Sequence, residues 1–274
     1  DPPQSKRFNS LDPKVGLEYS WGRQMLYGSF TRGFRSGSYN LGSPGTPGPV
    51  NPEKVSAFEH GGKHTLVPGV LFNWALFHYR YSDLQVSRVL DNGQGSLFFN
   101  QNAASATSKG AEAELIVSAI PRMNFSLAAA YTDAKYKRFP GAQAFVPAPN
   151  NGYGLVTQAV DVSGQRLPRA PRFTTSLDIK YDLPIGDSRL EFGGNVYYTS
   201  KYFLDTPSNI VQDDYAIVNA RVTLHLPGDR VSISAFANNL FNEFYIDSSS
   251  TNEFGFIGVP NDPRVIGTSV MLRF

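Results

Sequence analysis

Long segments in which apolar and polar residues alternate constrain this chain more than any other feature. Between residues 173 and 183 the odd positions read Phe, Thr, Leu, Ile, Tyr, Leu, and the even positions read Thr, Ser, Asp, Lys, Asp. A period of two indicates a β-strand, because successive side chains point to opposite faces of a sheet. The alternation recurs at residues 111–118, 216–225 and 264–274. The sequence therefore predicts a sheet with one apolar face and one polar face.

The length of these segments favours a membrane-spanning sheet over a soluble one. A tilted strand needs about 9 to 11 residues to cross a bilayer, whereas strands of soluble sheets commonly have about 5 to 6. About eleven such segments can be placed, with boundaries good to about 2 to 4 residues. They are residues 14–21, 25–35, 54–64, 70–86, 108–119, 123–137, 172–183, 189–203, 214–226, 231–246 and 263–274.

The connections between the expected strands alternate between short and long. The short turns are residues 21–24, 66–69, 120–122, 184–188 and 227–230. The long polar loops are residues 36–53, 87–107, 138–171, 204–213 and 247–262. Short turns on one side and long loops on the other are typical of bacterial outer-membrane barrels, whose turns are periplasmic and whose loops are extracellular. We expect an all-β protein, an antiparallel transmembrane β-barrel of the bacterial outer membrane, without a helix of note.

Composition excludes several other classes of protein. The chain has 25 basic and 23 acidic residues, a net charge of +2, which gives little support to a nucleic-acid partner. It has no Cys, so neither a disulfide framework nor a Cys-ligated metal is expected. No apolar run approaches the roughly 18 residues of a spanning helix.

Catalytic and metal-binding patterns are weak. His60 and His64 have the spacing of helical metal ligands, but on a strand such residues lie about 13 Å apart. No Gly-x-Ser-x-Gly turn is found, although a Ser/His pair formed across strands stays possible. We therefore expect no catalytic residue, no metal ligand and no cofactor, and we do not expect an enzyme.

Several ordered motifs resemble those of the TonB-dependent receptor family. They are DPKVGLEYSW (12–21), YGSFTRGFRSGSYN (27–40), NPEKVSAFEHGGK (51–63), LFNWALFHYRYSDLQV (71–86), NAASATSKGAEAEL (102–115), GQRLPRAPRFTTSL (164–177), VSISAFANNLFNEFY (231–245) and the terminal Phe274. They cover nearly the whole chain, in the order of the second half of the family's barrel.

The resemblance implies a 22-stranded barrel around a plug. Residues 1–274 would then be the carboxyl-terminal part of that barrel, with the plug and the first half of the wall absent from this chain. It implies active import of a scarce ligand, with an iron–siderophore as the first expectation. The implied partners are outer-membrane lipid and lipopolysaccharide, TonB with its inner-membrane motor through the absent amino-terminal part, and a small ligand such as an iron chelate, but no nucleic acid.

Ligand capture is expected from the loops and the upper inner wall, where aromatic and Arg side chains can grip a ligand hidden from lipid. The candidates are Tyr39, Phe98, Phe99, Phe145, Tyr153, Arg166, Tyr202 and Phe254. Four alternatives stay open at this point: a passive porin, a complete twelve-stranded barrel, a small outer-membrane barrel enzyme, and a soluble adhesion sandwich.

Overall fold

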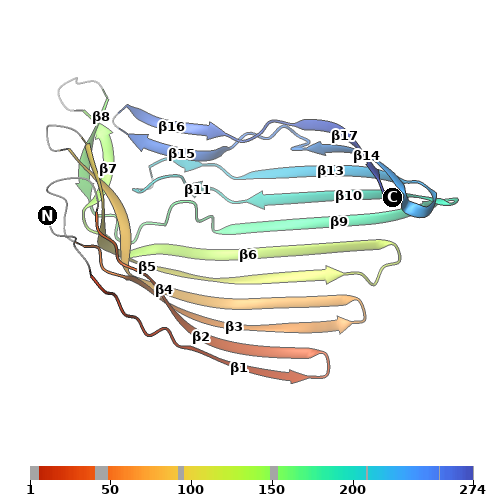
Figure 1. Cartoon of the computed structure of the whole chain (residues 1–274), viewed down its shortest axis with the longest axis horizontal. Helices are drawn as coiled ribbons and strands as arrows, with labels where there is room; N and C mark the ends of the chain where they lie inside the picture. The colour runs from red at the N-terminus through yellow and green to blue at the C-terminus, as the bar shows by residue number, and fades with distance from the viewer. Residues whose placement is uncertain are drawn as a thin grey trace.

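The structure, a computed structural model, describes residues 6–40, 49–91, 96–148, 154–207, 209–252 and 254–273, with the backbone alone for residues 88–91 and 96–98. Its main element is one antiparallel sheet of eleven strands (Figure 1). In sheet order they are β1 (Lys14–Trp21), β2 (Gln24–Arg35), β3 (Glu53–Val67), β4 (Val70–Asp91), β5 (Ser96–Val117), β6 (Met123–Arg138), β9 (Phe173–Ile185), β10 (Ser188–Thr199), β13 (Tyr215–His225), β14 (Val231–Asn238) and β17 (Val265–Leu272).

The connections sort to the two ends of this sheet. Turns of a few residues join strands at one end, on the right in Figure 1, and we call it the turn end. The opposite end, which we call the loop end, carries three two-stranded hairpins. These are β7 (Ala142–Pro147) with β8 (Leu155–Val160), β11 (Tyr202–Phe203) with β12 (Val211–Gln212), and β15 (Ile246–Asn252) with β16 (Gly255–Pro260). Gly22 and Gly186 each supply the positive φ that a tight turn requires.

Strand register gathers like side chains into rows on each face of the sheet. Leu177 of β9 lies opposite Leu127 of β6 and Val196 of β10. The next residue along, Asp178, lies opposite Ser126 and Asn195. The face that carries Leu177 is called the outward face, and the face that carries Asp178 is called the inward face.

The outward face leaves large apolar side chains exposed. Leu127, Phe192 and Ile233 are exposed by 41%, 39% and 42%, and Val270 by 64%. A soluble sandwich would bury such a face against a second sheet, but among the described strands this face has no covering layer. The exposed apolar face therefore favours a membrane barrel over a soluble sandwich.

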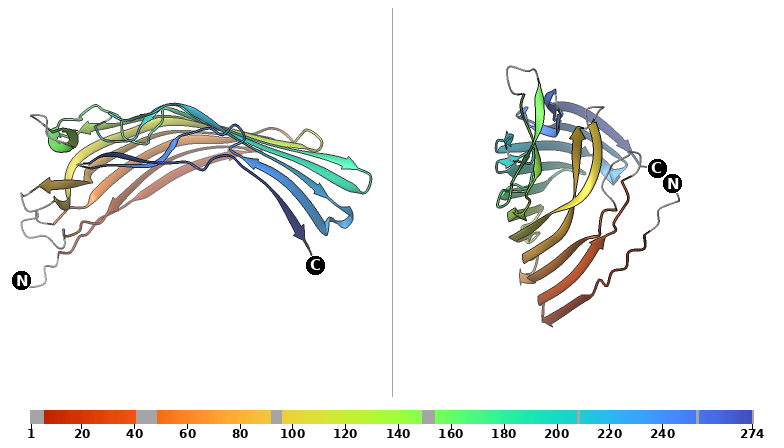
Figure 2. Two further views of the ribbon diagram at one scale, coloured as in Figure 1. Left: turned by 90° about the horizontal axis from the view of Figure 1, so that it is seen from above. Right: turned by 90° about the vertical axis from the view of Figure 1, so that its left-hand side faces the viewer.

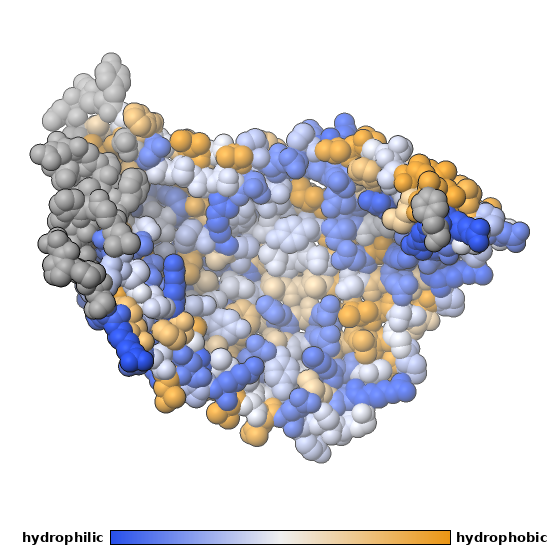
Figure 3. Space-filling view, in the orientation of Figure 1, coloured by the Kyte–Doolittle hydropathy of each residue, from blue (hydrophilic) through white to orange (hydrophobic). Residues whose placement is uncertain are grey.

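The inward face is concave and largely polar. The sheet curves as a trough in two views at right angles (Figure 2). The hollowed middle of the molecule is drawn mostly in blue and pale tones, while orange atoms gather chiefly toward the rims (Figure 3). The curved sheet remains open between β1 and β17 in this chain.

The eleven expected strands are all found in the main sheet, but four expected strand ends are wrong. Residues 87–107, expected as a loop, mostly belong to β4 and β5, which are 22 residues long each. The strand expected to reach residue 246 ends at Asn238, because Asn239 has a φ of 49° and leaves the extended conformation. The strand expected to reach residue 203 ends at Thr199, and Tyr202 and Phe203 form the separate strand β11.

No helix of the described residues is long and apolar enough to cross a membrane. The one helical turn assigned in the described part of the chain is a 3-10 turn over Pro227–Asp229.

Candidate functional site

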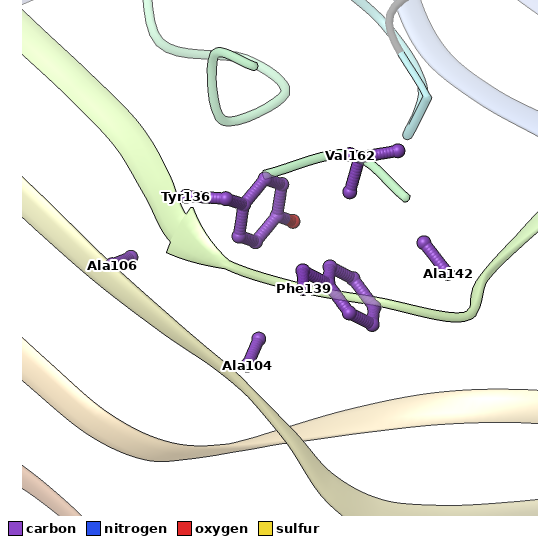
Figure 4. Packing of buried hydrophobic residues seen from close by; sticks show 6 residues of the cluster. All are labelled: Ala104, Ala106, Tyr136, Phe139, Ala142 and Val162. Atoms are coloured by element: carbon purple, nitrogen blue, oxygen red, sulfur yellow. The ribbon is translucent and has the colours of Figure 1, made fainter. Parts of the chain in front are cut away.

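A small buried cluster anchors the longest connection at the loop end. Tyr136 and Phe139 pack with their ring centroids 5.1 Å apart, and Val162 and Ala142 have no exposed surface (Figure 4). Ala104 and Ala106 of β5 complete the cluster. Backbone bonds reinforce it, since the Tyr136 amide donates to the Gln165 carbonyl at 2.9 Å. The two ends of this connection, at residues 139–142 and 160–167, are thus held against the wall.

Arg166, one of the predicted ligand contacts, lies on this anchored connection. Its backbone bridges to Lys135 at the end of β6. Its guanidinium donates to the Ala170 carbonyl at 2.7 Å and is half-buried. Burial lowers the pKa of Arg166, and the nearby Arg172 lowers it further. The residue is placed to hold a loop, and a minor part of its surface stays accessible.

Phe145, another predicted contact, lines a cleft between the loop-end hairpins. The cleft has a volume of about 320 Å³ and also includes Phe256 of β16. Its floor is the segment after β11, which Asp205 folds back by accepting the amides of Asn209 and Ile210 at 3.0 and 2.8 Å. The cleft is lined by Phe145, Leu155, Leu204, Asp205, Thr206, Pro207, Asn209, Ile210, Ser249, Ser250, Thr251 and Phe256.

Tyr202, a third predicted contact, belongs to a group of tyrosines. The rings of Tyr215 and Tyr245 stack with centroids 4.2 Å apart and planes 4° apart. Tyr202 is hydrogen-bonded to Tyr215. Burial raises the pKa of Tyr245, and Asp247 raises it further. The group therefore presents aromatic faces and protonated hydroxyls together, which suits a ligand with rings and polar oxygens.

A second loop-end cleft adjoins the tyrosine group. Its volume is about 440 Å³, and Tyr245 and Asp247 line it together with Asn219 and Asn238 of the wall. Asn239 beside it is buried and donates to the carbonyls of Glu243 and Asp262 at 2.8 and 3.2 Å. Sequence reasoning missed Tyr215 and the amides of this cleft.

The remaining predicted contacts are scattered. Phe254 is 87% exposed at the turn between β15 and β16, whereas Phe99 is only 5% exposed. Tyr39 is half-buried in the connection between β2 and β3. Tyr153 and the side chain of Phe98 lie outside the described residues. The structure thus gathers Phe145, Tyr202 and Arg166 on neighbouring loop-end segments, and it does not bring Phe254 or Phe99 into either cleft.

Two hollows also mark the inward face of the wall. One of about 350 Å³ has small side chains at its centre and Glu112, Glu114 and Asn73 among its lining residues. Asn73 donates to Glu114 at 2.8 Å. A second, of about 440 Å³, lies between Asp178, Asn195 and neighbouring strands. Glu112 and Glu114 thus lie on the inward face, next to one of these hollows.

A Ser/His pair is present near the turn end. Ser232 Oγ lies 3.0 Å from His225 Nδ1, and His225 Nε2 lies 3.4 Å from Glu191 Oε2. The same Glu191 oxygen lies 2.8 Å from Lys180 Nζ and 3.0 Å from Arg189, which neutralise it. Ser232 is 7% exposed, so its hydroxyl offers little surface to a substrate. We read the group as a charge network of the inward face.

The two His residues with metal-like spacing are engaged elsewhere. His64 bonds Gln24 Oε1 through Nδ1 at 2.7 Å and accepts the Trp74 indole proton at 3.1 Å. His60 bonds the Tyr27 carbonyl. Within the described ranges no three His, Asp or Glu side chains are grouped so as to hold a metal ion.

Comparison with known proteins decides what this wall belongs to. The model of the TonB-dependent receptor-like β-barrel family matches residues 2–240. The chain belongs to this family. TonB-dependent receptors are transport receptors of the bacterial outer membrane, so the outward face meets lipid, the turn end is periplasmic and the loop end is extracellular.

Solved structures of TonB-dependent receptors share the fold. The ferric yersiniabactin uptake receptor of Yersinia pestis superposes with a TM-score of 0.76 at 17% identity, over 95% of this chain and 37% of that chain. A siderophore receptor of Acinetobacter baumannii gives 0.70 at 16%, over 94% and 34%. The ferripyoverdine receptor of Pseudomonas aeruginosa gives 0.64 at 18%, over 94% and 32%. This chain spans about a third of the length of these receptors.

Proposed function

We propose that this chain contributes wall and extracellular loops to a receptor that captures an iron–siderophore and imports it with energy from TonB. The observation that carries the proposal is the pair of clefts at the loop end, one around Phe145 and one around Tyr245. Both combine aromatic faces with hydroxyl, amide and carboxylate oxygens, the mixture that a small polar ring-bearing ligand requires. Three of the solved relatives are receptors for siderophores or their ferric complexes by name.

We also propose that residues 1–274 form about half of a wall of 22 strands, the number found in outer-membrane transporters of this kind. The eleven strands of the open sheet support this, because an open sheet in lipid would leave unpaired backbone groups. A plug and a TonB-contacting segment would come from elsewhere in the receptor, and lipopolysaccharide would surround the loop end. Sequencing the complete gene tests the proposal, and a coding region without a plug-sized domain contradicts it.

Ligand binding tests the role of the clefts. We expect Phe145→Ala in the one cleft and Tyr245→Ala in the other, each made in the full receptor, to weaken binding of the cognate ferric siderophore by about tenfold, since each removes one aromatic contact. Binding is measured by quenching of intrinsic fluorescence across a panel of ferric siderophores. Phe241→Ala is the matched control, because Phe241 is 71% exposed and lies outside both clefts. Equal loss in all three variants would contradict the assignment.

Energy coupling is a separate test. Uptake of radiolabelled iron should stop when a protonophore collapses the inner-membrane proton gradient, while surface binding persists. A passive porin, the chief alternative of another class, would admit small solutes without energy and would conduct ions in planar bilayers. Energy-independent uptake would favour the porin.

The enzyme alternative rests on Ser232 and His225. We propose that this pair has no hydrolytic role, because Ser232 is buried and the carboxylate behind His225 is already neutralised. Purified receptor should release no product from short-chain or long-chain esters. Hydrolysis that disappears in Ser232→Ala but not in Ser234→Ala would show the opposite.

A further inference from the structure

A basic hollow lies on the outward face, at the extracellular end of the apolar band. The edge of the band follows one row of paired residues: Leu76 of β4, Ala111 of β5 and Tyr131 of β6. Leu76 is 50% exposed and Tyr131 is 51% exposed. Tyr131 pairs in turn with Phe173, the first residue of β9. The exposed aromatic side chains of Tyr131 and Phe173 at this level mark the boundary between hydrocarbon and headgroups.

Charge begins immediately above that row. The next outward row joins His78, Lys109 and Asp133, and the row above it joins Arg80, Thr107 and Lys135. Asp133 is the one carboxylate in the two rows, and it pairs with Lys135 at 3.1 Å. Among the described residues no ion pair reaches Arg80 or Lys109.

The hollow itself is bordered by these cations. Its volume is about 410 Å³, and half of its eight lining residues are basic while none is acidic. They are His78, Arg80, Tyr81, Ser105, Ala106, Thr107, Lys109 and Lys137. It forms where the strands are irregular, since β4 and β5 shift register between Tyr81 and Leu84 and β5 and β6 shift between Ser105 and Ala106. Bulges of this kind bend a sheet and re-aim side chains.

The surroundings indicate the occupant. A hollow that opens on the outward face cannot be reached from the lumen of the barrel, so a ligand in transit does not use it. Cations at the headgroup level attract anionic lipid headgroups, and Arg and Lys are the side chains that bind phosphate oxygens. Arg32 of β2, in the same row as Arg80, and Lys54 of β3, in the next outward row above, are both exposed and extend the basic surface.

We propose that the hollow binds the phosphate groups of an outer-leaflet lipid headgroup, with Arg80, Lys109 and Lys137 as its principal contacts. The site depends on location in the outer membrane and not on the identity of the imported ligand. It goes beyond the proposed transport function, because lipid retention and ligand uptake are measured separately.

The test is retention of lipid by the full receptor after purification from outer membranes in mild detergent. The variant combines Arg80→Gln, Lys109→Gln and Lys137→Gln. The control combines Arg23→Gln, Arg122→Gln and Arg230→Gln, which remove the same charge from exposed turn-end positions. Native mass spectrometry should show about fivefold less co-purified phosphorylated lipid for the variant, and a level near that of the parent for the control. Equal retention in variant and parent overturns the proposal, as does equal loss in variant and control.

Titration with defined lipids tests whether binding depends on the phosphate groups or on the rest of the headgroup. Parent receptor in phosphatidylcholine nanodiscs is titrated with diphosphorylated lipid A, with the same lipid after phosphatase treatment, and with inorganic phosphate. We expect saturable binding of the first alone. Equal binding of the phosphatase-treated lipid, or displacement by inorganic phosphate at equimolar concentration, overturns a lipid-headgroup site. If the triple variant does not assemble, the same titration is carried out with Lys137→Gln alone. Its folding is first checked by the folded band on unheated gels.

Discussion

At Gly110 the wall has room for a hydrogen atom and little more. A Cβ atom built there would lie 2.0 Å from the Tyr131 carbonyl oxygen and 2.6 Å from the ring of Phe77. The ring of Phe77 thus covers the glycine from the neighbouring strand, an arrangement that compensates for the lost side chain in a strand. Gly193, on the same inward face, would place its Cβ no closer than 3.9 Å to its nearest neighbour.

These two glycines give a matched prediction. Gly110→Ala should lower the free energy of unfolding by about 1 to 3 kcal/mol, the usual cost of overpacking, because backbone and ring must both move. Gly193→Ala should change it by less than about 0.5 kcal/mol. Urea titration of the folded receptor in lipid vesicles measures both. Equal effects of the two substitutions would contradict the inference that the neighbours of Gly110 leave no room for a side chain.

Asn239, which directly follows β14, is a second residue expected to contribute to the stability of the wall. It is 6% exposed, has a φ of 49° and accepts the Glu243 amide at 2.7 Å in addition to its two donated bonds. Asn239→Ala removes the bonds and places a Cβ residue at positive φ, whereas Asn239→Gly removes only the bonds. We expect Asn239→Ala to be the more destabilising of the two by about 1 kcal/mol in the same urea titration. The exposed Asn238→Ala should be near neutral, and a reversed order of the two Asn239 variants would contradict the role of φ.

Individual site residues were only partly predictable. Most of the aromatic residues predicted as ligand contacts lie at the loop end, and Phe145 and Tyr202 lie within or beside the groups found there. Tyr215 was assigned to a strand, and nothing in the sequence shows that residue 245 will fold over it. Stacking between residues 30 positions apart depends on the path of a loop. A loop has no hydrophobic periodicity from which that path could be predicted.

Among the elements, β4 and β5 show where sequence pattern stops being informative. Beyond the headgroup level no hydrocarbon selects apolar side chains, so residues 100–107 read as polar loop although they continue a strand. Side-chain amides clamp this extension instead. Asn102 donates to the carbonyls of Asn51 and Asp83 at 2.8 and 2.7 Å, and Gln85 donates to Ser36 at 2.9 Å.

Hydrogen bonds with Arg169 and Gln212 hold the β15–β16 hairpin to the rest of the loop end. Arg169 donates to the Asp247 carbonyl at 2.7 Å and to Ser249 Oγ at 3.3 Å. Arg169→Ala should therefore speed hydrogen exchange in residues 246–260 by about tenfold, while the unfolding midpoint of the wall stays unchanged. Lys201→Ala serves as the control. Unchanged exchange in Arg169→Ala would show that other contacts fix the hairpin.

At the scale of the whole molecule, the two faces of β9 make opposite demands. Leu177→Arg would place a charge on the outward face in mid-strand, at a cost of about 2 to 4 kcal/mol near the bilayer midplane. Ser176→Arg, one residue away, would face the inward hollow that Glu112 and Glu114 line, and should be tolerated. The yield of folded receptor in isolated outer membranes and its urea stability measure both. Equal loss for the two variants would contradict the assignment of faces.

The overall architecture was the most predictable level. Alternation sets which face meets lipid, and the sorting of short and long connections sets which end is which. Both signals are local and repeat in strand after strand, so a single misread boundary such as that near Asn239 does not disturb them. The loop-end hairpins lack such repetition and were missed.

Because short and long connections sort to opposite ends, each connection of this chain reports one side of the outer membrane. A peptide tag inserted after Phe254, at the exposed tip of the β15–β16 hairpin, should be stained by antibody on living cells. The same tag inserted after Gly186, in the turn between β9 and β10 where a Cβ would meet nothing within 4 Å, should stay dark until the envelope is permeabilised. The accessibility of the two tags to one fluorescent antibody would then show which end of the intervening strands faces the outside of the cell.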